Sequence, residues 1–165
     1  MTGRPYRALF VHSANELYGA DTVLLSLLES HPAEWEPHVV LPCDVPYEGL
    51  LAKRLSALDI SWEEMKLAVL RRRYLTPRRV PLYAAYFASS TIRLLRLIRR
   101  KGVQVVHSNT SAVVPGAVAA RLAGLPHIWH VHEMVVRPHW LRRILAALVP
   151  ALSNIVIAVS GAVRD

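Results

Sequence analysis

Short apolar runs alternate with longer amphipathic stretches along most of the chain. The short runs are almost continuously apolar, as strands buried on both faces of a sheet should be. The longer stretches repeat apolar residues at three- and four-residue spacing, which is typical of helices packed on one side. The predicted strands are Arg7–Ser13, Pro37–Pro42, Ile60–Met65, Val103–His107, His127–His132 and Ile155–Val159. The predicted helices are Ala20–Ser30, Glu48–Leu58, Pro81–Lys101, Ser111–Gly124 and Pro138–Leu152.

Several positions define the expected helix faces and ends. Ser111 is suited to cap the helix that it begins, and Gly124 is suited to end it. Residues 66–80 form a basic connector broken by Pro77, and Ser160 would open a further helix. The expected buried face of the first helix consists of Val23, Leu24, Leu27 and Leu28.

This alternation of strands and helices predicts an α/β domain with a Rossmann-like, doubly wound and mostly parallel sheet, covered by helices on both faces. The 165 residues suit a single domain, 1–165, and no linker or repeat divides them. A composition of 53% hydrophobic and 19% charged residues excludes wholesale disorder. The one cysteine, Cys43, excludes a disulfide scaffold and a zinc ribbon.

The longest apolar runs, Ala112–Ala120 and Ile144–Leu152, have only nine residues each. A transmembrane helix needs about 20 residues, and no signal peptide is readable, so the expected location is the cytoplasm.

The net charge of +8 comes from one segment of the chain. Residues 65–101 hold eleven basic residues and no acidic one, whereas the rest holds nine basic and twelve acidic residues. Such a segment indicates an anionic partner, either a membrane, a nucleic acid or a polyphosphate. The alternative is a solvated helix face next to a loop.

Polar residues follow several of the predicted strands. In open α/β sheets the ligand site lies beyond the carboxyl ends of the strands, where the strand order reverses. His12, His107 and His132 fall at three such ends, beside many hydroxyl and amide groups. These groups suit a polyhydroxylated or phosphorylated ligand. The candidate binding residues at the ends of the strands are Asn15, Tyr18, Gly19, His107, Asn109, Thr110, Glu133 and Ser160.

Standard nucleotide and hydrolase signatures are missing from these loops. The sequence has no G-x-G-x-x-G after the first strand, no P-loop and no nucleophile elbow. His12, His107 and His132 could converge, but no carboxylate or cysteine is spaced to complete a metal site, and none is predicted. Asp44, after the second strand, reads as an ordinary loop residue.

Three segments, 10–30, 103–133 and 154–165, resemble the N-terminal half of a family 4 glycosyltransferase with the GT-B fold. The first resembles that family's glycine-containing loop, followed by an acidic residue and an aliphatic helix. The second resembles the strand, helix and strand that end in the family's histidine. The third resembles the strand and serine that close this half.

The resemblance implies two Rossmann-like domains facing a cleft, of which this chain is the acceptor-side one. The donor-binding domain, or a partner chain that supplies it, would lie outside these 165 residues. Sugar transfer would proceed with retention and without a metal or other cofactor, because the nucleotide-sugar is the co-substrate.

Individual roles follow from the same resemblance. His132 matches the catalytic histidine that contacts the transferred sugar, Gly19 matches the loop near the donor phosphates, and Ser160 matches the serine near the interdomain edge. Tyr18 and Asp21 depart from the family, which often has glycine and glutamate there.

Many members of this family act on lipid-linked or membrane-bound acceptors, so the basic segment is expected to dock on an anionic membrane. In the helix Pro81–Lys101, one face would carry Phe87, Leu94, Leu95 and Ile98. The candidate membrane-binding residues are Arg71, Arg72, Arg73, Arg78, Arg79, Arg93, Arg96 and Arg100.

The sequence therefore predicts the N-terminal domain of a retaining glycosyltransferase that acts on a polysaccharide or lipid-linked acceptor at the inner face of the cell membrane. This chain alone should be inactive, because half a cleft cannot position both reactants. One alternative is a non-catalytic subunit of a two-chain transferase. Another is a nucleic-acid-binding domain, although the basic segment contains no recognisable stacking motif and no nucleic acid is expected.

Overall fold

A computed structural model describes residues 5–74, 76–132 and 138–160 and contains one six-stranded sheet. Its order is β3-β2-β1-β4-β5-β6, and each neighbouring pair is parallel, which confirms the predicted fold class. The strands are β1 (Tyr6–Val11), β2 (Trp35–Pro42), β3 (Ser61–Met65), β4 (Val105–Ser108), β5 (His127–Val131) and β6 (Ile155–Ala158). The α-helices are α1 (Gly19–Glu29), α2 (Leu50–Ala57), α3 (Val80–Lys101), α4 (Val114–Ala123) and α5 (His139–Leu152).

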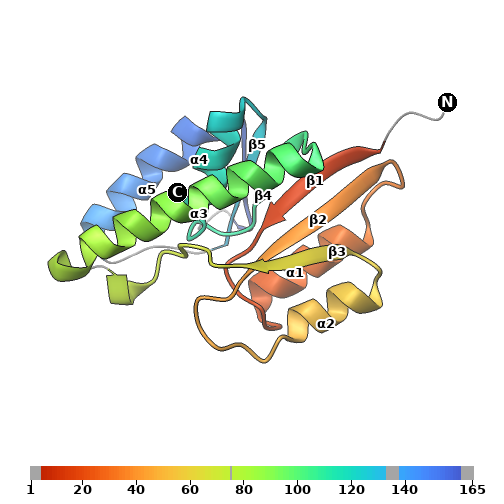
Figure 1. The fold of residues 1–165 in the computed structure, drawn as a ribbon, viewed down its shortest axis with the longest axis horizontal. Helices are drawn as coiled ribbons and strands as arrows, with labels where there is room; N and C mark the ends of the chain where they lie inside the picture. The colour runs from red at the N-terminus through yellow and green to blue at the C-terminus, as the bar shows by residue number, and fades with distance from the viewer. Residues whose placement is uncertain (1–4, 75, 133–137, 161–165) are drawn as a thin grey trace.

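Helices cover both faces of the sheet, with α1 and α2 on one face and α3, α4 and α5 on the other (Figure 1). Successive side chains of a strand point to opposite faces, so β1 serves two cores. Phe10 packs in the core under α1 and α2, whereas Leu9 and Val11 pack in the core under α3 and α4.

The strand order reverses between β1 and β4, because the chain builds β2 and β3 on one side of β1 and then crosses to the other. Loops that leave the carboxyl ends of β1 and β4 therefore diverge, and in this class of sheet ligands bind at that position. His12 follows β1 and Asn109 follows β4 at this point.

Helix α1 is rotated by one position from the predicted face. Leu24, Leu25 and Leu28 are buried, whereas Val23 and Leu27 are 37% and 38% exposed, so the predicted face was wrong for these two residues. The buried face also includes Asp21. Asp21, Leu24, Leu25 and Leu28 follow helical spacing, but a count of apolar residues alone leaves the aspartate out.

Helix α4 begins at Val114 and not at the predicted Ser111. The preceding turn is held by tertiary hydrogen bonds, because the indole of Trp129 donates to the Thr110 carbonyl and the Leu70 amide donates to the Ala112 carbonyl, both at 2.8 Å. Gly124 ends the helix in the left-handed conformation, as predicted.

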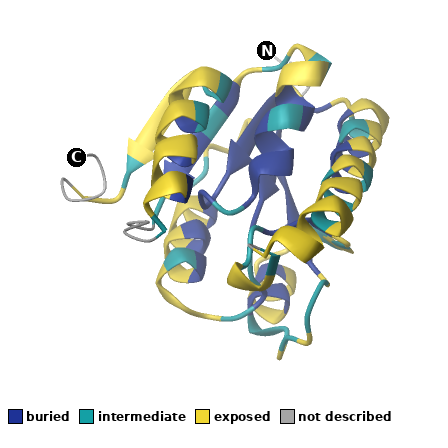
Figure 2. Cartoon of the chain, turned by 90° about the vertical axis from the view of Figure 1, so that its left-hand side faces the viewer, coloured by how far each residue is buried: buried dark blue, intermediate teal, exposed yellow. Residues whose placement is uncertain are grey.

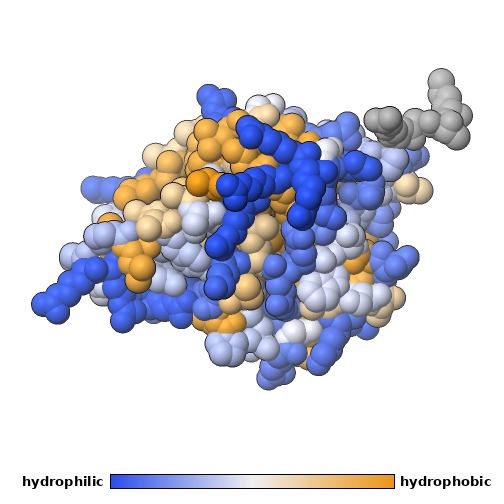
Figure 3. All heavy atoms as spheres, viewed as in Figure 1, coloured by the Kyte–Doolittle hydropathy of each residue, from blue (hydrophilic) through white to orange (hydrophobic). Residues whose placement is uncertain are grey.

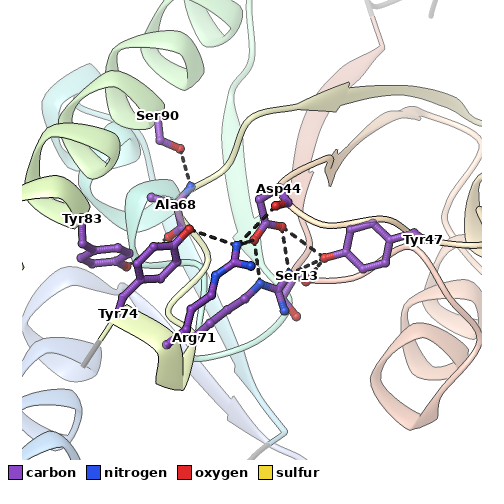
Figure 4. Close-up of polar contacts among 9 residues, drawn as sticks. Ser13, Asp44, Tyr47, Ala68, Arg71, Tyr74, Tyr83 and Ser90 are labelled. Atoms are coloured by element: carbon purple, nitrogen blue, oxygen red, sulfur yellow. Dashed lines mark hydrogen bonds and ion pairs between the residues drawn. The ribbon is translucent and has the colours of Figure 1, made fainter. Parts of the chain in front are cut away.

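The basic connector, residues 66–80, is held against the domain by buried residues and tertiary hydrogen bonds. Leu67, Ala68 and Val69 are buried. The Ala68 amide donates to the Ser90 hydroxyl at 3.0 Å, and the Tyr83 hydroxyl donates to the Ala68 carbonyl at 3.1 Å (Figure 4). Two short 3-10 turns, η1 (Arg72–Tyr74) and η2 (Pro77–Arg79), then lead into α3. The buried residues of α3 are Ser90, Thr91, Leu94, Leu97 and Ile98.

The strand β6 lies at the edge of the sheet, and its residues are exposed or half-buried (Figure 2). The further helix predicted from Ser160 lies almost wholly outside the described residues. Within the described ranges, no helix is long and apolar enough to cross a bilayer.

Candidate functional site

The carboxyl edge of β1 holds a buried histidine–carboxylate pair. Nε2 of His12 lies 2.5 Å from Oδ1 of Asp21, and both side chains are almost fully buried. The other carboxylate oxygen of Asp21 accepts a hydrogen bond from the Tyr18 amide at 2.8 Å. Asp21 thus joins the end of β1 to the first turn of α1.

Asn109 connects this pair to β4. Its side-chain Nδ2 lies 3.0 Å from the Ala20 carbonyl oxygen and 3.1 Å from Nδ1 of His12. Its main-chain amide donates to the Val11 carbonyl at 2.9 Å. Because Asn109 is fully buried and contacts β1 and α1, it fixes the geometry at the reversal of strand order.

His132 extends the connection to β5. Its Nε2 lies 3.2 Å from Oδ1 of Asn109, and its ring packs 4.2 Å, centroid to centroid, from that of His130. Burial lowers the pKa of His132, and the nearby His12 lowers it further, whereas Asp21 raises it. We call Asp21, His12, Asn109 and His132 the site network.

Gly19 and Tyr18 form the open side of this region. Gly19 begins α1, and a Cβ built on it would meet no atom within 4 Å. The Tyr18 residue is 74% exposed. A ligand can therefore approach the first turn of α1, where main-chain amides and the helix dipole favour an anion.

The other predicted binding residues are placed differently. Asn15 is buried and structural, since its side chain accepts from the Ala52 amide at 2.9 Å and donates to Glu64 at 3.2 Å. His107 and Thr110 are also buried. Ser160 is exposed after β6, and Glu133 lies outside the described residues.

Three buried histidines on β4 and β5 have lowered pKa values and are neutral at pH 7. Burial lowers the pKa of His107 to about 3 and that of His130 to about 4, with neighbouring histidines lowering both further. His127 also has a pKa of about 4 through burial, and it meets the Ser108 hydroxyl at 2.9 Å. The described residues contain no group of ligands that could hold a metal ion.

A second polar cluster forms around Asp44, which follows β2. The side chain of Asp44 is only 2% exposed, and Arg71 donates to both of its carboxylate oxygens at 2.7 and 2.9 Å (Figure 4). Arg71 also donates to the Ser13 carbonyl at 3.3 Å and contacts the Tyr47 hydroxyl. Its hydrogen bond with Asp44 raises the pKa of Arg71. Asp44 is therefore more than the ordinary loop residue expected from the sequence.

The eight predicted membrane-binding arginines fall into two groups. We call those with an ion pair held, and those with no ion pair among the described residues free. Arg71 and Arg73 share Asp44, and Arg100 lies 3.3 Å from Glu63. Arg93 approaches the Lys66 carbonyl at 3.5 Å. Those with no ion pair among the described residues are Arg72, Arg78, Arg79, Arg93 and Arg96, all of them exposed.

The surface around α3 carries both strongly hydrophilic and apolar side chains. Figure 3 shows strongly hydrophilic side chains projecting over the face that α3 covers, with apolar atoms beside them. At the beginning of α3, Val80 and Leu82 are exposed next to Arg78 and Arg79. The aromatic rings of this region pack on one another, with the Tyr74 and Tyr83 centroids 5.1 Å apart.

Sequence reasoning missed the roles of His12 and Asp21 in the site. The sequence shows Asp21 only as a departure from the family's glutamate, and it places His12 at a strand end without indicating that the two side chains meet. The signal that was available is their placement, because a buried aspartate on an otherwise apolar helix face requires a polar partner.

The parallel strand order and the helices on both faces define a Rossmann-like domain of the kind that forms one half of a GT-B fold. The family model for glycosyltransferase family 4 matches residues 18–165, and the chain belongs to this family. This confirms the resemblance seen in the sequence. No curated protein matches the chain.

Solved structures share the fold at low sequence identity. MurG of Acinetobacter baumannii is 15% identical with a TM-score of 0.63, and the match covers 93% of this chain and 41% of that one. A putative UDP-N-acetylglucosamine 2-epimerase of Listeria monocytogenes is 12% identical with a TM-score of 0.64, covering 97% and 40%. The Neisseria meningitidis UDP-GlcNAc 2-epimerase, solved bound to UDP-GlcNAc, is 14% identical with a TM-score of 0.57, covering 90% and 39%. The chain spans about two fifths of the length of these proteins.

Proposed function

We propose that this chain is the acceptor-side half of a retaining glycosyltransferase that moves a sugar from a nucleotide-sugar to a polysaccharide or lipid-linked acceptor. The observation that carries the proposal is the placement of His132 at the end of β5, where it contacts Asn109, which lies at the reversal of strand order beside the open first turn of α1. A donor-binding domain, in the same polypeptide or a partner chain, would complete the cleft. The chain alone should therefore not turn over.

The geometry suits a sugar-transfer site in two respects. A neutral imidazole at His132 can hydrogen-bond to a hydroxyl of the transferred sugar. Gly19 leaves space at a helix N-terminus, where the phosphates of a nucleotide-sugar would be favoured. The Neisseria epimerase, which shares this fold, binds UDP-GlcNAc, and this supports a nucleotide-sugar as the class of donor.

The test compares His132→Ala with His139→Ala in the transferase that contains this chain. His139 is an exposed histidine at the start of α5 and serves as the matched control. Turnover with a panel of nucleotide-sugars should fall by about 10²-fold in His132→Ala, because a group that supports the transition state is lost. The His139→Ala variant should keep native turnover.

Thermal melting separates chemistry from folding in the same experiment. His132 is only half-buried, so the His132→Ala variant should melt close to the native temperature. Near-native turnover in this folded variant would refute the catalytic role of His132. A large drop in melting temperature would show that His132 is structural.

We further propose that the exposed arginines before and along α3 dock the protein on an anionic membrane surface at the cytoplasmic face. Arg72, Arg78 and Arg79 combine positive charge with the exposed apolar residues Val80 and Leu82. This combination of basic and apolar side chains is typical of segments that lie at a membrane interface. Such docking would bring a lipid-linked acceptor to the carboxyl edge of the sheet, where the site network lies.

A further inference from the structure

The orientation of the Asn109 amide is determined by α1. The Ala20 carbonyl can only accept a hydrogen bond, so the atom 3.0 Å from it must be the donating Nδ2 of Asn109. Oδ1 of Asn109, which can only accept, then faces Nε2 of His132 at 3.2 Å. The donor in that contact is therefore the ring of His132.

The same reasoning fixes the hydrogen positions on His12. Its Nδ1 lies 3.1 Å from Nδ2 of Asn109 and accepts a hydrogen bond from it. Nε2 of His12 must then carry the hydrogen and donate to Oδ1 of Asp21. Oδ2 of Asp21 accepts from the Tyr18 amide, so both carboxylate oxygens are used. Reversing any one contact would place two donors or two acceptors face to face.

We propose that Asn109 is a positioning residue that holds the His132 ring in one orientation with its hydrogen on Nε2, and that the buried pair of His12 and Asp21 fixes Asn109 in turn. The proposal rests on the transferase function proposed above. Asn109 itself reaches no ligand, because it is fully buried behind His132, His12 and the first turn of α1.

This arrangement specifies what His132 can recognise. Nε2 is engaged by Asn109 and Nδ1 has no hydrogen-bond partner within the described ranges, so Nδ1 is the ring nitrogen that we assign to a ligand. In the neutral ring with hydrogen on Nε2, Nδ1 is an acceptor. It would meet a group that donates, such as a sugar hydroxyl, and would not hydrogen-bond to an ionised phosphate oxygen, which can only accept.

The decisive kinetic experiment is a double-mutant cycle in the complete transferase. Asn109→Ala should reduce kcat by about tenfold to a hundredfold, because a misplaced catalytic group costs rate on this scale. In a His132→Ala background the same substitution should cost little more, since the group that it positions is already absent. KM for the nucleotide-sugar should change much less than kcat. Equal losses in both backgrounds would overturn the proposal and assign Asn109 a merely structural role.

A second experiment measures the tautomer of the His132 ring directly and does not depend on enzyme activity. In ¹⁵N-labelled chain above the pKa of His132, NMR should show one tautomer with hydrogen on Nε2. Asn109→Ala should move the two ring-nitrogen shifts toward each other, as the tautomers begin to exchange.

Two further variants keep the experiment interpretable. Asp21→Asn is the alternative if Asn109→Ala fails to fold. It leaves Asn109 and His132 in place but gives His12 and the Tyr18 amide only one oxygen to share. The His132 tautomers should then begin to exchange. Asn154→Ala removes an amide that accepts from the His127 main chain at the opposite end of β5, and it should leave the His132 shifts unchanged. Native His132 shifts in both Asn109→Ala and Asp21→Asn would overturn the proposal. A fixed tautomer in a chain whose complete enzyme transfers no sugar would instead refute the proposed function alone.

Discussion

Two polar regions lie along the same edge of the sheet, and they differ in how their polar groups are satisfied. The site network is buried except for the half-buried His132, and its members hydrogen-bond to one another in a single direction. The arginine segment, residues 71–74 and 76–79, is largely exposed, and among the described residues only its Arg71 and Arg73 are tied to a buried carboxylate. The first region suits precise placement of a small ligand, whereas the second suits contact with a large charged surface.

This difference has an electrostatic cause. Burial disfavours charge, so the buried histidines are neutral at pH 7, and their contribution to the free energy of unfolding depends on pH. Arginine stays charged at any physiological pH, and its interactions at an exposed site depend on salt instead. Acid should therefore disturb the histidine region first, and salt should disturb the arginine segment.

The largest expected effect is acid unfolding. Burial lowers the pKa of His107 to about 3 and that of His38, His127 and His130 to about 4, from the ordinary value of 6.5. Between pH 6.5 and 4 the unfolded chain therefore binds more protons than the folded chain. The free energy of unfolding should fall as the pH falls through this range, on the order of several kcal/mol in total.

Urea unfolding at several pH values between 4 and 8 measures this loss. The matched variant is His107→Phe, because Nε2 of His107 is buried without a partner in the described part of the chain and the ring packs against Phe10. This variant should lose less stability in acid than the native chain. A free energy of unfolding that stays constant from pH 7 to pH 4.5 would contradict the assignment of neutral buried histidines.

The next effect concerns the free arginines. Replacing Arg72, Arg78 and Arg79 with glutamine should weaken binding to anionic vesicles by about two decades, at about 1 kcal/mol for each basic residue near the surface. High salt should have the same effect on the native chain, since the Debye length falls from about 10 Å at 0.1 M to about 3 Å at 1 M. Co-sedimentation with anionic and neutral vesicles provides the measurement.

The held arginine Arg71 is the control for that experiment. Arg71→Gln removes two hydrogen bonds from the buried carboxylate of Asp44, so it should lower the free energy of unfolding by about 1–3 kcal/mol. Its vesicle binding should stay close to native. If Arg71→Gln loses as much vesicle binding as the triple variant, the division into held and free arginines is wrong.

The smallest expected effect is the difference between substituting two glycines, Gly116 and Gly19, near the carboxyl ends of the strands. A Cβ on Gly116 would lie 2.6 Å from the hydroxyl of Ser108, which contacts His127, and 3.3 Å from Val11. Gly116→Ala should therefore lower the free energy of unfolding by about 1–3 kcal/mol through overpacking. Gly19→Ala meets no protein atom and should leave stability unchanged, while a nucleotide-sugar that approaches α1 closely would bind it less well.

Thermal melting of both variants, together with the nucleotide-sugar KM of the complete enzyme, measures this contrast. A stable Gly116→Ala chain would show that the packing between α4 and β4 can relax. An unchanged KM in Gly19→Ala would show that the donor does not approach this turn.

The sequence by itself determined the architecture. The near-continuous apolar runs predicted the strands, and the alternation with amphipathic helices favoured a parallel sheet. The central strands β2 and β4 are buried as that pattern predicts, whereas the edge strand β6 is mostly exposed. His132 was predicted as a site residue from its place at a strand end and from a family resemblance. Both kinds of signal are local, because they depend on residues that are neighbours in the chain.

Tertiary structure alone decided which polar residues meet. Asn109 and His12 are far apart in the chain, yet their side chains contact each other. Helix α1 supplies a partner to each of them, the Ala20 carbonyl to Asn109 and the buried carboxylate of Asp21 to His12. Arg71 and Arg72 are adjacent and chemically identical, yet one is bound to Asp44 and the other is exposed. Burial and partnership arise from contacts between distant segments, and hydrophobic periodicity carries no information about them.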